Sequence, residues 1–118
     1  MTSYAVGILN NVRLGPGVTE YLERIDDTLA PFGGRFVVHG GQPDVREGTS
    51  PGTLIVIGFP DRQAAVGWYE SPAYQAILPL RTANADGVVF LIDGVGPDHR
   101  ATDVLAGPVS RADRGGGR

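Results

Sequence analysis

Residues 67–81 read Gly-Trp-Tyr-Glu-Ser-Pro-Ala-Tyr-Gln-Ala-Ile-Leu-Pro-Leu-Arg and hold the single Trp of the chain and two of its four Tyr. Ser71 and Pro72 are typical of a helix start. The Ser hydroxyl can accept a hydrogen bond from a free backbone amide, and the N–H that Pro lacks would have no partner at the first helical position. The stretch therefore predicts two consecutive helices, the second interrupted or kinked at Pro79. So many large side chains are expected either in the wall of a pocket or in the core.

The segments on either side of this stretch predict strands. Residues 53–59, Thr-Leu-Ile-Val-Ile-Gly-Phe, and residues 88–92, Val-Val-Phe-Leu-Ile, are β-branched or aromatic and apolar at consecutive positions. Residues 4–9, Tyr-Ala-Val-Gly-Ile-Leu, show the same pattern. Asp61 is expected to cap the helix that follows residues 53–59, because its carboxylate can accept hydrogen bonds from the free backbone amides of the first turn.

The first part of the chain adds a helix and another strand. Apolar residues recur at helical spacing from Val18 to Leu29, with Tyr21 at the edge of the stripe, so an amphipathic helix is expected to end near Pro31. Residues 35–39 predict a strand. Simple alternation along this strand places its side chains on two faces, with Phe36 and Val38 on one and Arg35, Val37 and His39 on the other.

The order of these elements, β-α-β-β-α-β, indicates an α+β fold of the ferredoxin-like kind, a four-stranded antiparallel sheet with its helices on one face. Two helices cover only one face of such a sheet, yet three of the strands are apolar on both sides. A bare apolar face of that size is rare in monomers. We therefore expect a homodimer in which this face is covered by the same face of a second copy.

Composition narrows the class of protein. The 118 residues carry a formal net charge of -3, which argues against nucleic acid as a partner. The chain has no Cys, no apolar run long enough to span a membrane and no basic and apolar leader, so a cytoplasmic protein is expected. Residues 1–95 are predicted to form the domain and residues 96–118 a tail that is flexible or packed on a partner subunit.

Several short motifs are shared with a known family: Phe-Gly-Gly-Arg-Phe at 32–36, Gly-Gly at 40–41, Glu-Gly at 47–48, Phe-Pro at 59–60, Trp-Tyr-x-Ser-Pro-x-Tyr-Gln at 68–75 and Leu-Arg at 80–81. In these the chain closely resembles the domain-of-unknown-function family 1330, over about residues 4–95. The resemblance implies a dimeric α/β barrel, a superfamily that includes monooxygenases, isomerases and cyclases acting in the cavity between sheet and helices. Two positions differ: Gly58 stands where members often carry Glu, and His39 where they often carry Arg.

His39, Arg35 and Arg81 are the charged or titratable candidates for a site. His39 is either a general base near neutral pH or a strand-end residue in contact with water. Arg35 and Arg81 can grip a carboxylate or enolate through paired hydrogen bonds, or can form structural ion pairs with nearby acidic residues, Glu47, Glu70 or Asp86.

Trp68, Tyr69 and Tyr74 either line a flat pocket for an aromatic ligand or belong to the core. No glycine-rich nucleotide motif, phosphate loop or nucleophile elbow occurs, so no cofactor is expected. His39 and His99 are far apart in sequence and define no metal site.

Two functions of different class fit these residues. The first is a cofactor-free enzyme acting on a small anionic or aromatic molecule, with His39 as base, Arg35 and Arg81 holding an anionic oxygen, and Trp68 with Tyr74 as the aromatic wall. The second is a homodimer that binds a small molecule without catalysis or has a structural role.

Overall fold

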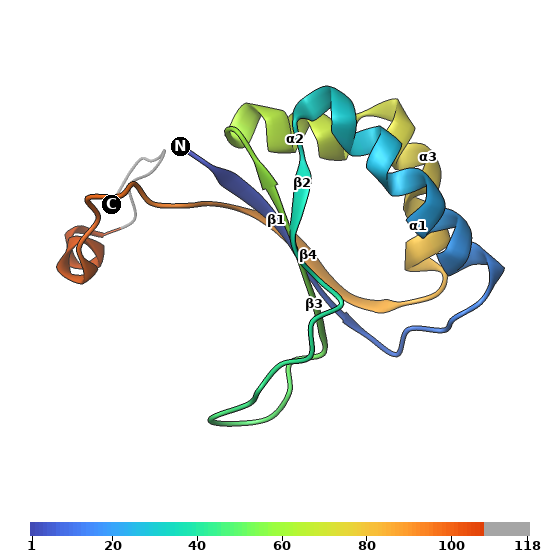
Figure 1. The fold of residues 1–118 in the computed structure, drawn as a ribbon, viewed down its shortest axis with the longest axis horizontal. Coiled ribbons are helices and arrows are strands. Elements are labelled where there is room, and N and C mark those ends of the chain that lie inside the picture. Colours follow the sequence, from blue (N-terminus) through green and yellow to red (C-terminus); the bar gives the residue numbers. More distant parts are fainter. Residues whose placement is uncertain (108–118) are drawn as a thin grey trace.

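The computed structural model describes residues 1–107, in which a four-stranded antiparallel sheet carries all three α-helices on one face (Figure 1). The sheet order is β2-β3-β1-β4. The elements are β1 (Ser3–Asn10), α1 (Pro16–Leu29), the 3-10 helix η1 (Ala30–Phe32), β2 (Arg35–His39), β3 (Thr53–Phe59), α2 (Arg62–Glu70), α3 (Pro72–Thr82), β4 (Asp86–Asp93) and the 3-10 helix η2 (Ala101–Ala106). This arrangement confirms the predicted α+β fold.

The two predicted helix caps are both present. The Asp61 carboxylate accepts the Ala64 amide at 2.8 Å at the start of α2. The Ser71 hydroxyl accepts the Tyr74 amide at 3.2 Å at the start of α3 and donates to the Trp68 carbonyl at 2.7 Å. α3 then continues through Pro79, so the predicted interruption there is wrong, and the alternative of a kink stays a prediction. Pro79 lies in the last turn, where the loss of one backbone hydrogen bond is tolerated.

The glycine pair before β2 is required by packing. Gly33 has a φ of 68°, a backbone conformation that favours glycine, and it ends η1. A Cβ on Gly34 would lie 2.6 Å from the Phe59 ring and 2.8 Å from the Leu29 side chain. The chain can therefore turn tightly from the helix into the sheet only because both residues lack a side chain.

The core lies between the helices and the sheet. Trp68, Tyr74 and Ile77 of the helices are each no more than 2% exposed, and Phe59 of β3 packs against the Trp68 ring with 5.4 Å between ring centroids. The Trp68 indole N–H donates to the Thr28 hydroxyl of α1 at 2.9 Å, which ties α1 to α2 inside the core. The stretch 67–81 thus supplies much of the helical half of the core.

β2 contains a β-bulge, which corrects the predicted alternation. Phe36 pairs with Ile57 and His39 pairs with Ile55, but the register shifts between Phe36 and Val38. The extra residue lets Phe36 and His39 point to the same face, toward the helices, where their rings stack with centroids 4.2 Å apart. His39 therefore does not share a face with Arg35, as simple alternation had predicted.

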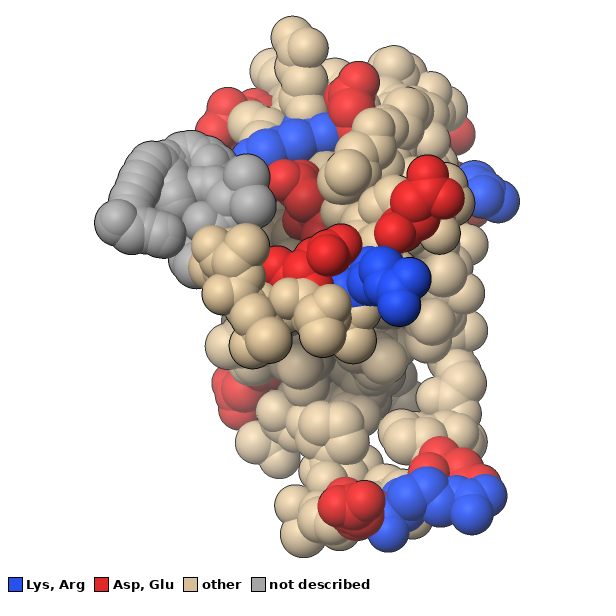
Figure 2. All heavy atoms as spheres, turned by 90° about the vertical axis from the view of Figure 1, so that its left-hand side faces the viewer, with Lys and Arg blue, Asp and Glu red and all other residues tan. Residues whose placement is uncertain are grey.

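The face of the sheet that points away from the helices is apolar, and no other element within residues 1–107 covers it. We call it the outer face. The register of the strands places on it Tyr4, Val6, Ile8, Val37, Val38, Leu54, Val56, Gly58, Val88, Phe90 and Ile92, with Arg35 and Asp86 at strand ends. Val88, Phe90 and Ile92 are 56%, 42% and 49% exposed. In Figure 2 a largely uncharged surface lies between charged side chains above and at the lower tip.

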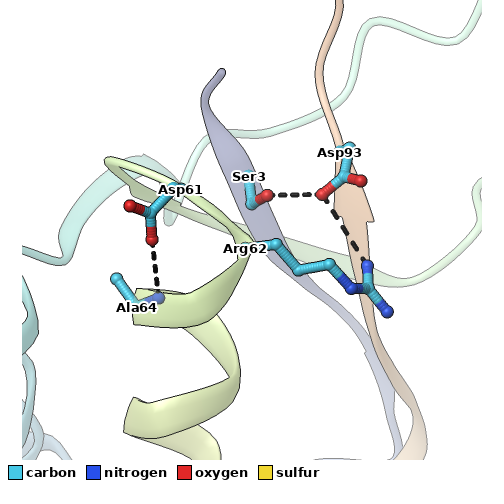
Figure 3. A network of polar contacts seen from close by, with 5 residues as sticks. All are labelled: Ser3, Asp61, Arg62, Ala64 and Asp93. Atoms are coloured by element: carbon cyan, nitrogen blue, oxygen red, sulfur yellow. Dashed lines mark hydrogen bonds and ion pairs between the residues drawn. The ribbon is translucent and has the colours of Figure 1, made fainter. Parts of the chain in front are cut away.

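A polar network joins α2 to the sheet (Figure 3). The Ser3 hydroxyl donates to the Asp93 carboxylate at 2.5 Å, across the β1–β4 pair. The Arg62 guanidinium lies 3.7 Å from the same carboxylate, and Asp61 caps the helix beside it. Arg62 and Asp93 are both exposed, so this ion pair adds little stability. The network positions the first turn of α2 over the start of β1.

The segment after β4 forms the short helix η2 at residues 101–106. The predicted tail extends to residue 118, and its part from residue 108 lies outside the described residues. Among residues 1–107 no helix has the length and apolar character needed to cross a bilayer.

Candidate functional site

A cavity of about 90 Å3 lies between the sheet and the helices. It is mostly apolar, partly open to solvent, and reaches from Trp68 in the core to Leu9 near the end of β1. Arg81 contributes the one side chain with a full charge at neutral pH among the described residues that line it. We call this space the Arg81 cavity.

Two tyrosine hydroxyls and the Arg81 guanidinium form the polar end of the cavity. The hydroxyl oxygens of Tyr21 in α1 and Tyr74 in α3 are 2.7 Å apart and share a hydrogen bond. Their rings meet edge to face with 6.2 Å between centroids. Arg81 follows Tyr74 by two turns of α3 and lies beside both hydroxyls. Three polar groups from two helices therefore converge on one end of an apolar space.

The environment of this polar end favours a neutral Tyr21 and a charged Arg81. Burial raises the pKa of Tyr21 well above its usual value, the Tyr74 hydroxyl raises it further, and Arg81 opposes the rise in part. Burial alone would lower the pKa of Arg81, but the oxygens of Tyr74 and Tyr21 outweigh it, so the net shift is upward. The cavity therefore carries a permanent positive charge.

The Arg81 guanidinium has unused hydrogen-bonding capacity. Its Nε atom is buried and has no hydrogen-bond partner among the described residues. None of the ion pairs within residues 1–107 includes Arg81, so the structural pairing considered for it with Glu47, Glu70 or Asp86 is not seen there. A buried donor without a partner is costly, and an acceptor on a bound molecule would relieve that cost.

Phe36 and His39 lie on the sheet side of the same cavity. The bulge in β2 brings both rings to this face, and their stacking fixes the His39 imidazole beside an aromatic surface. His39 is itself exposed at the end of β2, just before Gly40, which has a φ of 85°. A histidine at the rim can reach both the solvent and a molecule inside.

The structure thus brings four of the six predicted site residues to one space: His39, Trp68, Tyr74 and Arg81. It does not bring the other two. Arg35 pairs with Gly58 on the outer face, and Tyr69 packs against the Tyr74 ring at 5.5 Å without lining the cavity. The roles assigned to all six remain predictions.

Sequence reasoning missed Tyr21 and Phe36 as parts of the site. Tyr21 gave a signal, because a tyrosine at the edge of an apolar helical stripe can bury its ring and direct its hydroxyl into a cavity. Phe36 gave no such signal, because its place in the sequence pattern is the same as that of an ordinary core residue. His39 was singled out, but its face was predicted wrongly because a bulge leaves no clear mark in five residues.

Groups of three or more His, Asp or Glu side chains placed to hold a metal ion are not found among residues 1–107. The polar end of the Arg81 cavity offers a guanidinium and two hydroxyl groups, which suit an anion rather than a metal. Position 58 lies on the outer face, so a Glu there, as the resemblance describes for relatives, would not enter this cavity.

The model of a protein family described as domain of unknown function, DUF1330, matches residues 2–95. The chain belongs to this family. The match confirms the resemblance drawn from the short motifs, and it leaves the segment after residue 95 outside the family domain. Among curated proteins the comparison finds no significant match.

Solved structures of unknown function share the fold. The RPA0582 protein from Rhodopseudomonas palustris superposes with a TM-score of 0.62 at 16% identity, covering 81% of this chain and 84% of that one. A methylated form of RPA0582 gives 0.62 at 15% identity, covering 83% and 84%. A dimeric ferredoxin-like protein from Jannaschia sp. CCS1 gives 0.55 at 18% identity, covering 81% of this chain and 100% of that one. At these identities the likeness shows the ferredoxin-like fold alone.

Proposed function

We propose that this protein binds a small, mostly apolar molecule with one acidic group in the Arg81 cavity. The observation that carries the proposal is the buried Nε of Arg81, which has no hydrogen-bond partner within residues 1–107 and lies at the end of an otherwise apolar space. A carboxylate or enolate would accept hydrogen bonds from this guanidinium, and the apolar part of the molecule would lie toward Trp68.

The neighbouring hydroxyls favour the same class of ligand. Tyr21 and Tyr74 together have two O–H groups, and their mutual hydrogen bond uses only one of these protons. The other can be donated to the ligand. Because the cavity contains no carboxylate among its described lining residues, a cationic ligand would meet only the charge of Arg81. An anion is therefore favoured over an amine of the same shape.

The volume limits the size of the ligand. The cavity measures about 90 Å3, less than the roughly 150 Å3 of an engineered cavity that accepts benzene. A short branched acid fits inside, and a benzoate-like ring fits with one edge at the open mouth beside His39 and Phe36. Long-chain acids and nucleotides exceed this space.

Binding can be tested by calorimetry and thermal unfolding with matched probes. Isovalerate and benzoate should bind and raise the melting temperature, while the neutral isovaleramide and benzamide should bind more weakly, because they lack the charge that pairs with Arg81. Arg81→Met should weaken acid binding by at least about tenfold, the lower end of what a hydrogen bond to a charged group contributes. Arg46→Met, on an exposed loop, is the control and should have no effect. Equal binding of acids and amides would refute the proposal.

A second candidate is the cofactor-free enzyme, favoured by the presence of His39 beside the same cavity as Arg81. The imidazole would take a proton from the bound molecule while Arg81 stabilises the negative charge that develops. His39→Asn should abolish turnover and leave acid binding intact. If mass spectrometry detects no chemical change in any bound acid, or if His39→Asn turns it over as fast as the wild type, the binding role stands alone.

We further propose that the outer face forms the interface of a homodimer. This face is apolar, and Val88, Phe90 and Ile92 stay about half exposed without a partner. A structural neighbour of this chain is described as dimeric. Sedimentation velocity should give twice the chain mass at micromolar concentration, and a strictly monomeric protein would refute the interface.

A further inference from the structure

The segment after β4 leaves the body of the protein as an arm, which we define as residues 95–107. The β1–β4 pairing ends where the Gly94 amide donates to the Thr2 carbonyl at 2.7 Å. A Cβ on Gly94 would lie 3.0 Å from the Tyr4 ring, so a glycine suits this close approach. Figure 1 shows that the arm then projects to the side of the sheet opposite the helices.

The arm has its own local order but makes no hydrogen bond to the rest of the described chain. The Asp103 carboxylate accepts the Arg100 amide at 3.1 Å and lies 3.7 Å from the His99 ring, at the start of η2. Its backbone hydrogen bonds also stay within the arm. A six-residue 3-10 helix has too few hydrogen bonds to be stable alone in water. Packing on another surface is therefore needed to hold it.

The arm carries apolar side chains that stay exposed among residues 1–107. Val95, Val104 and Leu105 are 63%, 69% and 83% exposed. The arm does not shield its own outer face either, since Phe90 and Val88 remain open there. Within residues 1–107, both the arm and the outer face therefore keep apolar side chains exposed.

The position of the arm favours a second subunit on the outer face as the surface that it contacts. The loop between β2 and β3, residues 40–52, projects to the same side of the sheet as the arm (Figure 1). A subunit placed on the outer face would therefore lie between these two projections and would contact both. In a twofold dimer each arm meets the other subunit in the same way.

We propose that the arm packs against the partner subunit of the sheet-to-sheet homodimer, with Val104 and Leu105 as its apolar contacts. This inference rests on the proposed dimer and adds a second contact region beyond the sheet. It assigns a role in assembly to Val104 and Leu105, which lie outside the family domain.

Substitutions at the exposed surface of η2 test the inference in the full chain. Leu105→Asp should raise the dimer dissociation constant at least tenfold, about 1.4 kcal/mol, because two carboxylates per dimer would replace apolar contacts. Thr102→Asp is the matched control on the same helix, and it should change the constant by less than twofold. A dimer that Leu105→Asp leaves as tight as the wild type would overturn the arm contact and leave the sheet interface standing. A monomeric wild type would overturn both.

Crosslinking shows directly which surface the arm meets. A photoreactive phenylalanine replaces Leu105, and isotopically light and heavy chains are mixed before irradiation. Crosslinks between light and heavy chains, ending on strands or loops of the other copy, are expected. Crosslinks confined to single chains would show that the arm folds back on its own subunit and would overturn the inference.

Discussion

Phe90→Asp is the substitution that most directly tests the outer face. Phe90 lies in the middle of β4, opposite Val6, and is 42% exposed in the single subunit. Full burial of a Phe side chain is worth about 1.5–3 kcal/mol, so covering the exposed part in a dimer contributes roughly 0.6–1.3 kcal/mol. A twofold dimer contains this contact twice, which corresponds to roughly tenfold to sixtyfold in the dissociation constant.

The aspartate adds a second effect, because each carboxylate would be placed in an apolar interface without a partner. Together we expect at least a hundredfold weaker dimer, on the order of 3 kcal/mol. Sedimentation velocity across a micromolar concentration series measures the change, and circular dichroism confirms that the variant is folded. Leu14→Asp is the control, since Leu14 is 86% exposed in the loop before α1. A folded Phe90→Asp variant that dimerises like the wild type would show that the interface lies elsewhere.

Three further predictions concern the core and its caps. Thr28→Val leaves the buried Trp68 N–H without its acceptor and should lower the free energy of unfolding by about 1–3 kcal/mol in urea titrations, whereas an unchanged value would refute the contact's role. Ser71→Ala removes the cap of α3 and should cost about 1 kcal/mol by the same assay, while Ser71→Gly should cost only a few tenths. The pKa of Tyr21 is raised in the folded protein, so the neutral hydroxyl contributes its full stability below the usual tyrosine pKa of about 10, and this contribution is lost as the pH rises above that value. Tyr21→Phe should therefore flatten the fall of the free energy of unfolding at alkaline pH.

Local signals in the sequence were sufficient for most of the fold. Residues 35–39 and 53–59 were predicted as strands with the bounds that the structure gives, because β-branched runs between glycines and prolines leave few alternatives. Asp61 and Ser71 cap helices as their chemistry predicted. These elements depend on contacts within a few residues, which is why the sequence alone was informative.

The candidate site was less predictable, because it depends on contacts between distant segments. The hydrogen bond between Tyr21 and Tyr74 joins residues 53 positions apart, and no local pattern reports it. Arg81 was identified by its chemistry, but the sequence could not show that the groups beside it would be hydroxyls rather than carboxylates. The face of His39 depended on a single extra residue in β2, which alternation alone could not detect.

The bulge also means that β2 holds one residue more than its ladder needs. Deleting Val37 would leave Phe36 opposite Ile57 and His39 opposite Ile55, so both rings would still face the Arg81 cavity. The strand can therefore shorten by one position and still place the same two rings on the cavity. If β2 of a relative lacks this bulge, a gap placed at Val37 would match residues of equal orientation, whereas an ungapped alignment would set the His39 imidazole against a side chain on the opposite face.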